Sequence, residues 1–260
     1  MALELYNFPA STCSQKVRIC LHEKNLGWVD HILEARQSEH LTPAYLKLNP
    51  NGVVPTLVHD GEPIIESTVI VEYLDEIFPE PALSPDTPLK VARMRSWLSF
   101  FEEVPTPAVR YPSFQNVLIN PFKEISPEQF ENAACRRPLR NEFYQRMGQE
   151  GFSDHEMNKA FNDIKLTAER IENALSDGRP WIMGEQFTLA DICVIPTFDR
   201  MEDLRYQYLW EDNHPNLTTW LRSAQERPSV KSAFYKGSRF SDIYQELELG
   251  KILKAENKRH

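Results

Sequence analysis

The stretch FPASTCSQKVRICL, residues 8–21, decides the fold, because an alternating strand pattern runs there through a polar turn into a helical pattern. The first N–H groups of a helix have no partner within the helix, and the helix dipole adds partial positive charge, so this turn attracts an anion. Ser11, Thr12 and Cys13 can each hydrogen-bond an anion, and Cys13 can become one, because the pKa of a thiol falls at helix N-termini. Taken alone, such side chains are more often simple caps.

Length and charge bound the class of protein. With 260 residues, 41% of them hydrophobic, the chain can bury one large core or two modest ones, and we expect two domains. The formal net charge is −9 and the pI about 5.4, so the chain lacks the basic surface of a protein that binds nucleic acid or an anionic membrane. We expect neither partner, and any bound anion must be held by local groups.

The sequence also predicts a cytoplasmic protein without a metal. No apolar run approaches the ~18 residues of a membrane-spanning helix, and the first residues have the pattern of a strand rather than of a signal peptide. The four cysteines, Cys13, Cys20, Cys135 and Cys193, are widely spaced and form no metal-ligand pair. We therefore expect neither a disulfide framework nor a structural zinc.

The first 78 residues alternate between strand and helix patterns. They predict strands at 3–8 and 28–33, a helix from the turn to about residue 25, a short helix at 43–48, a hairpin of strands at 56–59 and 63–66, and a helix from residue 67. Thr42 and Pro43 supply an N-cap and a proline at the first helical position, and Ser67 is expected to cap the last helix. The order β-α-β-α-β-β-α predicts a small α/β sheet covered by helices, with the first two strands parallel.

Prolines mark the end of this unit. Pro79, Pro81, Pro85 and Pro88 predict a stiff linker at 79–88, between a domain at 1–78 and an all-helical domain at 89–260. Helices are predicted at 89–103, from 127 with an interruption at 137–138, at 154–175, from 189, and at about 216–226, with an irregular aromatic stretch at 108–125 and a weakly helical tail at 240–253 before a frayed end. Capping boxes that begin at Ser126, Ser153 and Thr188 support three of these helix starts.

Four separated motifs resemble the glutathione S-transferase family, in particular its zeta- and theta-like bacterial members. They are S-x-C-S-x-K-V-R at 11–18, NPNGVVPTL at 49–57, IESTVIVEYL at 65–74, and WIMG with FTLAD at 181–184 and 187–191. Each motif alone is weak, but together they keep the family's order over about residues 2–230. The resemblance implies a thioredoxin-like N-terminal domain that binds glutathione and an all-helical C-terminal domain that shapes a pocket for a second, hydrophobic substrate.

The resemblance also implies a set of glutathione-binding residues. Val54 and Pro55 resemble the family's cis-proline element, whose first residue pairs main chain to main chain with the cysteinyl part of glutathione. Glu66 and Ser67 resemble the pair that holds the γ-glutamyl end, since a carboxylate can pair with its ammonium and a serine at a helix N-terminus can receive its carboxylate. The alternatives are an ordinary trans proline, a strand end and a simple cap.

Two residues bear on the glycyl end of glutathione. His40 lies where theta-like members place a histidine near the glycyl carboxylate, and the alternative is a solvated loop histidine. Val53 departs from the family's pattern, because that position often carries a basic residue that would bind the same carboxylate. His40 is therefore the candidate for this end.

Ser11 lies seven residues before Arg18, which is the spacing of the catalytic serine in zeta- and theta-like transferases. Its hydroxyl would donate a hydrogen bond to the sulfur of glutathione and, with the helix N-terminus, favour the nucleophilic thiolate. Omega-like members carry cysteine at this position, whereas here the cysteine comes two residues later, at Cys13. The spacing favours Ser11 as the catalytic residue and argues against a mixed-disulfide mechanism.

Aromatic and apolar residues on the turn and beyond residue 100 are candidates for the pocket of the second substrate. For any one ring the alternative is core packing. Arg110 either meets an acidic substrate or leaving group, or is a surface charge. The candidates are Phe8, Pro9, Ala10, Phe100, Phe101, Arg110, Tyr111, Phe114, Phe198 and Tyr206.

Three functions stay open. The first is a detoxification enzyme that transfers glutathione to a small electrophile. The second is glutathione-dependent cleavage of β-aryl ethers, because residues 66–79 and the long stretch at 105–150 resemble bacterial β-etherases of lignin breakdown. The third is a non-catalytic interaction module of the same fold, against which the presence of Ser11 with Glu66 and Ser67 argues. The family usually forms homodimers, and Trp97 and Phe101 are surface candidates for the interface.

Overall fold

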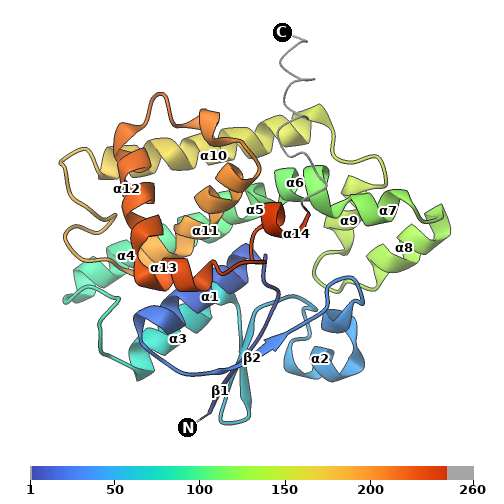
Figure 1. The fold of residues 1–260 in the computed structure, drawn as a ribbon, viewed down its shortest axis with the longest axis horizontal. Helices are drawn as coiled ribbons and strands as arrows, with labels where there is room; N and C mark the ends of the chain where they lie inside the picture. Colours follow the sequence, from blue (N-terminus) through green and yellow to red (C-terminus); the bar gives the residue numbers. More distant parts are fainter. Residues whose placement is uncertain (1, 245–260) are drawn as a thin grey trace.

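A four-stranded sheet forms the N-terminal part of the molecule (Figure 1). The computed structural model describes residues 2–244. The strands are β1 (Leu3–Asn7), β2 (Val29–Ile32), β3 (Thr56–His59) and β4 (Glu62–Ile65), in the spatial order β2-β1-β3-β4. β1 pairs in parallel with β2 and antiparallel with β3, and Leu5 lies opposite Leu57 with both side chains fully buried. The predicted parallel pair and hairpin are confirmed.

Three helices accompany the sheet: α1 (Thr12–Glu23), α2 (Pro43–Leu48) and α3 (Ser67–Ile77). α1 and α3 contact each other and share the core with the buried faces of β1 and β3. α2 begins as predicted, because the Thr42 hydroxyl accepts the N–H of Tyr45 (3.4 Å) and Pro43 is the first helical residue. The thioredoxin-like order of elements is confirmed.

From α3 to residue 244 the regular elements are all helical. They are α4 (Pro88–Glu103), α5 (Pro105–Ala108), α6 (Arg110–Ser113), the π-helical η2 (Phe114–Leu118), α7 (Asn120–Lys123), α8 (Pro127–Cys135), α9 (Asn141–Met147), α10 (Asp154–Ala174), α11 (Leu189–Asp203), the 3-10 helix η3 (Gln207–Leu209), α12 (Pro215–Glu226), α13 (Pro228–Ala233) and α14 (Phe240–Ile243). The predicted fold class is confirmed, while the boundaries at 78 and 88 stay a prediction. The tail predicted beyond residue 244 lies outside the described residues.

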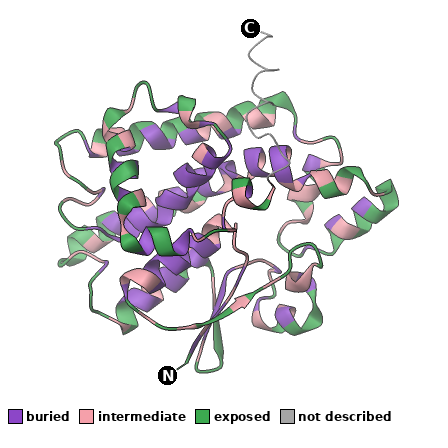
Figure 2. Cartoon of the chain, in the orientation of Figure 1, coloured by how far each residue is buried: buried purple, intermediate pink, exposed green. Residues whose placement is uncertain are grey.

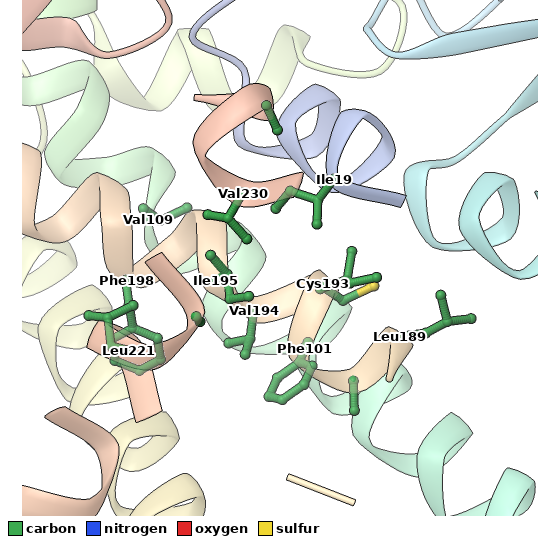
Figure 3. Close-up of a cluster of buried hydrophobic side chains, with 14 of the residues drawn as sticks. Ile19, Phe101, Val109, Leu189, Cys193, Val194, Ile195, Phe198, Leu221 and Val230 are labelled. Atoms are coloured by element: carbon green, nitrogen blue, oxygen red, sulfur yellow. The ribbon is translucent and has the colours of Figure 1, made fainter. Parts of the chain in front are cut away.

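α11 lies at the centre of the helical part and is buried along nearly its whole length (Figure 2). It contacts α1 on one side and α4 and α12 on others. Figure 3 shows Cys193 and Ile195 of α11 gathered with Ile19 of α1, Phe101 of α4 and Val230 of α13. The sheet and the helices therefore share one continuous hydrophobic core.

Asp191 fixes the start of α11. Its Oδ2 accepts hydrogen bonds from the N–H (2.9 Å) and the hydroxyl (3.1 Å) of Thr188. Its Oδ1 accepts from the N–H of Ile182 (3.0 Å) and from Nε1 of Trp220 (2.9 Å). The predicted capping box is confirmed, and it also ties the loop after α10 and the helix α12 to the start of α11.

A second, smaller core lies between α6 and α10. Ile119, Phe130, Met147 and Phe152 form this buried satellite core, joined by half-buried aromatic rings from α6 to α9. The segment that carries it touches the N-terminal part of the chain at Gly52, whose φ is +59° and where a Cβ would lie only 3.1 Å from Cδ of Pro138. A glycine is required at this close approach.

Two expectations about local structure are wrong. The stretch at 108–125 is not irregular but forms α6, η2 and α7, because α5 and α6 pack on α10 and this packing offsets the local effect of the prolines. Ser67 does not cap α3. The N-cap is Glu66, whose φ of 70° turns the chain sharply out of β4, so that Ser67 is already the first helical residue.

Candidate functional site

Ser11 is the N-cap of α1. Its Oγ accepts a hydrogen bond from the N–H of Ser14 (3.3 Å), and its own N–H donates to the carbonyl of Phe8 (3.1 Å). The side chain is half-buried. Because the cap bond uses only a lone pair of Oγ, the hydroxyl proton is free to be donated to a ligand beyond the helix end. Capping and sulfur activation are therefore compatible roles for Ser11.

Two buried arginines hold the turn that precedes Ser11. Arg18 of α1 donates from Nη2 to the carbonyl of Pro9 (2.7 Å), and Arg200 of α11 donates from Nη2 to the carbonyl of Ala10. Burial lowers the pKa of Arg200 to about 10, which still leaves the guanidinium charged at neutral pH. Groups from both halves of the chain thus bind consecutive carbonyls and fix the position of Ser11.

Cys13 lies in the first turn of α1 and is half-buried, as is Thr12. The charges that interact with Cys13 belong to Lys16 of the same helix and to Arg140, the N-cap of α9. Lys16 Nζ donates to Glu102 of α4 (2.5 Å). The same carboxylate oxygen accepts the hydroxyl of Thr68 of α3 (2.7 Å), so this polar cluster joins α1, α3 and α4.

A loop held by side-chain hydrogen bonds presents Val54. Asn49 Nδ2 donates to the carbonyl of Val53 (2.9 Å), and the Tyr45 hydroxyl donates to the same oxygen (2.6 Å). The peptide bond from Val54 to Pro55 is cis, as the resemblance implied. Neither the N–H nor the carbonyl of Val54 is hydrogen-bonded within residues 2–244. The loop therefore offers an open main-chain donor and acceptor to an extended ligand.

Glu66 and Ser67 stand at the start of α3. The Glu66 side chain is exposed, and its Oε1 accepts a hydrogen bond from Nδ2 of Asn51 (3.1 Å). Ser67 is only 5% exposed, and in the described part of the chain its hydroxyl has no hydrogen-bond partner. The first N–H groups of α3 also lack partners within the helix. A carboxylate beside an anion-attracting helix end suits the ammonium and carboxylate of an α-amino acid group.

His40 lies in the short helix η1 (Glu39–Leu41), with its ring edge-on to Phe8 and the two centroids 5.1 Å apart. Its Nδ1 is buried and has no partner among residues 2–244. Burial, with the nearby charge of Arg137, lowers the pKa of His40 to about 4. The imidazole is therefore neutral at neutral pH and can donate one hydrogen bond to a carboxylate, but it supplies no charge.

The candidate pocket residues are divided between the surface of the turn and the two cores. Phe8, Pro9 and Ala10 are half-buried on the turn itself. Phe101 and Phe198 have no exposed surface, so the expectation that they line a pocket is wrong, because both rings face the main core.

The remaining pocket candidates lie beside the satellite core or around α10. Tyr111 and Phe114 pack against the satellite core, while Phe100 lies under the guanidinium of Arg170 at 4.1 Å. Tyr206 is buried and its hydroxyl accepts from Asn116 (2.8 Å).

Comparison with known proteins identifies the family. Residues 5–82 match the model of the glutathione S-transferase N-terminal domain, and residues 154–223 match that of the C-terminal domain. Protein LigF from Sphingobium sp. SYK-6 is 30% identical over 246 residues, which cover 92% of this chain and 95% of LigF. The chain belongs to the glutathione S-transferase family.

Further relatives agree with the membership in the glutathione S-transferase family. The crystal structure of the β-etherase LigF has a TM-score of 0.80 at 29% identity and covers 90% of this chain and 99% of its own. Maleylacetoacetate isomerase from Pseudomonas aeruginosa is 46% identical over 98 residues, 36% of this chain and 45% of that protein. A glutathione transferase from Burkholderia graminis, solved with two glutathione molecules per subunit, has the same fold at 23% identity, a TM-score of 0.69 and coverage of 90% of this chain and 87% of its own. The prediction of an enzyme of this family is confirmed.

Several residues of the site have no clear sequence signal. Arg200 lies beside Asp199 in the charged end of α11, where nothing in the sequence distinguishes it from a surface charge. Asn51 and Arg140 carry no local signal, because their partners are 15 or more residues away in the chain. Within residues 2–244, no group of three or more His, Cys, Asp or Glu side chains is placed to hold a metal ion, and no helix there is long and apolar enough to cross a membrane.

Proposed function

We propose that this protein is a glutathione transferase in which the Ser11 hydroxyl stabilises the glutathione thiolate for attack on a small hydrophobic electrophile. The observation that carries the proposal is the start of α1. There, Ser11 accepts its cap bond from Ser14 and keeps its hydroxyl proton for a ligand, at the N-terminus of a 12-residue helix.

Glutathione would lie extended between the start of α3 and the loop that ends at Pro55. The γ-glutamyl ammonium would pair with Glu66, and its carboxylate would receive the Ser67 hydroxyl and the first N–H groups of α3. The open N–H and carbonyl of Val54 would pair with the cysteinyl main chain. The neutral His40 would donate to the glycyl carboxylate. In this orientation the sulfur would lie next to Ser11.

The protein's contribution to the chemistry is electrostatic. A hydrogen bond from Ser11 and the dipole of α1 lower the pKa of the bound thiol, and each unit corresponds to about 1.4 kcal/mol of preference for the thiolate. The thiolate then attacks carbon and a C–S bond forms. In a displacement the leaving group departs with the electron pair of its broken bond, and in an addition or ring opening the atom that receives that electron pair takes a proton from solvent. Holding the electrophile close to the sulfur supplies the remainder of the rate enhancement.

A turnover screen with glutathione tests the proposal. The panel contains aryl halides, epoxides, isothiocyanates and β-aryl ethers, and glutathione binding is measured in parallel by calorimetry. We expect glutathione-dependent turnover of at least one class. Binding of glutathione without turnover of any class would instead favour the non-catalytic interaction module.

A second candidate function is cleavage of β-aryl ethers. The observation that favours it is the similarity to the β-etherase LigF over nearly the whole chain, which includes the satellite core region. In that reaction the thiolate would attack the carbon that bears the aryloxy group, the C–S bond would form and the C–O bond would break, and the phenolate would take a proton from solvent. A β-aryl ether with a chromogenic phenol tests it, since one phenol should appear for each glutathione consumed.

A cytoplasmic location and a role in detoxification belong to the same proposal. The net charge of −9 supports the absence of nucleic-acid and membrane partners.

A further inference from the structure

Packing of the satellite core brings two arginines together beside the proposed glutathione site. Arg110 is the first residue of α6, and Arg140 is the N-cap of α9. The two helices meet next to them, where the ring of Tyr111 lies 5.6 Å from that of Phe143, centroid to centroid. Both arginines are half-buried. They are 30 residues apart in the sequence, and the fold brings them close enough for their charges to interact.

The pair faces the starts of α1 and α3. The charge of Arg140 interacts with Arg110, with Cys13 of α1 and with Glu66 at the start of α3. The charge of Arg110 interacts with Glu102, the residue that also binds Lys16 and Thr68. Arg140 is therefore a neighbour of the starts of α1 and α3, and Arg110 is a neighbour of the polar cluster around Glu102.

In the described part of the chain, no carboxylate forms an ion pair with either guanidinium group. Neither side chain donates a hydrogen bond within residues 2–244, although the whole chain carries nine more acidic than basic charges. The nearby carboxylates already have other partners: Glu66 accepts from Asn51, and Glu102 from Lys16 and Thr68. Burial and the charge of Arg110 both lower the pKa of Arg140, which is the direction expected for two like charges held together. Such an arrangement is unfavourable until an anion binds between them.

We propose that Arg110 and Arg140 form an anion subsite of the second-substrate pocket, which takes a carboxylate group of the electrophile. The proposal rests on the proposed function and names its substrate class: a small electrophile that carries an acidic group on the side away from the reacting carbon. Planar guanidinium groups bind a carboxylate in a bidentate geometry, which suits this pair better than a lysine pair.

The carboxylates of glutathione have other places in the site. The γ-glutamyl carboxylate would be received at the start of α3 by Ser67, and the glycyl carboxylate would lie at His40, whose charged neighbour is Arg137. The side of the turn next to Cys13 is left for the second substrate. Neither arginine is therefore needed to bind a carboxylate of glutathione in the orientation that we propose.

Two conjugates that fill both halves of the site test the subsite without any turnover. They are S-(4-carboxybenzyl)glutathione and its neutral match, S-(4-carbamoylbenzyl)glutathione, and their Kd values are measured by calorimetry. We expect the wild type to bind the acid at least about tenfold more tightly than the amide, as for a charge-assisted bidentate contact. Arg110→Met and Arg140→Met should each reduce that ratio to less than about threefold, while Arg140→Lys, which keeps a point charge, should retain part of it.

The control variant is Arg136→Met, which removes an exposed arginine at the end of α8 in the same segment and should keep the wild-type ratio. Equal Kd values for the two conjugates in the wild type, or a ratio that survives in both methionine variants, would overturn the subsite. So would an equal weakening of glutathione and both conjugates in the variants, because the pair would then bind glutathione itself. A wild type that binds neither conjugate and no glutathione would contradict the proposed function. The anion subsite would then be contradicted as well, because it rests on that function.

Discussion

Ser11 and Ser67 both lie at helix starts, but they occupy different positions in their helices. Their hydroxyl groups therefore differ in which hydrogen bonds remain available to a ligand. Ser11 is an N-cap, so its oxygen is engaged and its proton is free. Ser67 is the first residue of α3, beyond the cap, and within residues 2–244 its hydroxyl has no partner. The cap of α3 is Glu66, which makes no cap bond. A ligand carboxylate can therefore bind at α3 without displacing an existing bond of Ser67.

Removal of the Ser67 hydroxyl should weaken glutathione binding. We expect Ser67→Ala to cost about 1–3 kcal/mol, or roughly five- to 150-fold in Kd, because the ligand carboxylate loses a buried donor. Ser67→Thr, which keeps a hydroxyl, should restore most of the affinity, and neither variant should change the melting temperature by more than a few degrees. Calorimetry with unchanged glutathione affinity in Ser67→Ala would remove this residue from the site.

His40 should make the fold sensitive to acid. Its pKa is about 4 in the folded protein against an ordinary 6.5, so below pH 6.5 the unfolded chain binds a proton that the folded protein does not. The stability contributed by the neutral ring is therefore complete above pH 6.5 and is lost as the pH falls toward 4. Free energies of unfolding measured from pH 4 to 7 should fall more steeply in the wild type than in His40→Gln, by at most about 1.4 kcal/mol per pH unit. Parallel pH profiles for the two proteins would contradict the assignment.

Sequence motifs can identify site residues that lie in the turns forming the site. They cannot identify residues that reach the site from distant parts of the chain. Ser11, Val54 and Glu66 lie in short motifs next to the turns that present them. Arg200 binds the turn from α11, and the charge of Arg140 interacts with Cys13 and Glu66 from the start of α9, and no local sequence pattern indicates either interaction. Periodicity likewise shows that a helix has an apolar face but not what covers it, so pocket and core candidates could not be separated before the packing was known.

At the scale of elements, local chemistry predicts helix starts well. The boxes at Ser126, Ser153 and Thr188 all begin helices. At Ser126 and Ser153 the hydroxyl accepts the N–H three residues later, and in all three boxes the side chain three residues later accepts the N–H of the cap residue. The segment at 108–125 shows the limit of this reasoning. Its prolines argue against helix, but packing on α10 overrides them.

Loss of the Asp191 carboxylate should lower the free energy of unfolding, and Asp191 should have no contact with the substrate. Four donors converge on its buried carboxylate, so Asp191→Ala leaves them unsatisfied and should cost about 3–5 kcal/mol. Denaturant unfolding measures this cost. Asp212→Ala, at an exposed aspartate, is the matched control and should stay within about 0.5 kcal/mol of the wild type. Wild-type stability combined with lost activity in Asp191→Ala would show that the residue belongs to the site instead.

At the scale of the whole molecule, one core joins the sheet to the helices. The Nε2 of Gln15 in α1 donates to the carbonyl of Ser238 (2.9 Å), and Arg18 donates to that of Ala233 (3.1 Å), so α1 is held directly by residues near the C-terminal end of the described chain. The order of the domains can be predicted from the sequence, because the proline-rich stretch separates a region of alternating strand and helix patterns from a region of helix patterns alone. The contact between them involves residues more than 200 positions apart and becomes visible only in the fold.

We predict a homodimer, with α3 and α4 as the contact face. Phe101 was a candidate for the interface, but it is fully buried. The exposed large apolar side chains on these helices are instead Val69 (54% exposed), Ile77 (36%) and Leu89 (64%). Sedimentation equilibrium should give about twice the 30.3 kDa of the chain at micromolar concentration, and Val69→Glu should shift the mass toward the monomer. A mass of 30.3 kDa for the wild type would contradict the prediction.

The central claim is that Ser11, and not Cys13, activates the sulfur, and a pH titration of the bound thiolate by its ultraviolet absorbance tests it most directly. The proteins are the wild type, Ser11→Ala, Ser11→Gly and Cys13→Ser, each saturated with glutathione; the glycine variant removes the hydroxyl while keeping most of the cap's stability. We predict that both Ser11 variants raise the pKa of bound glutathione by about one unit or more, which is about 1.4 kcal/mol, and that Cys13→Ser titrates like the wild type. The claim would be contradicted if bound glutathione titrated in both Ser11 variants as it does in the wild type while Cys13→Ser was inactive. That result would assign the protein to thiol transfer through Cys13.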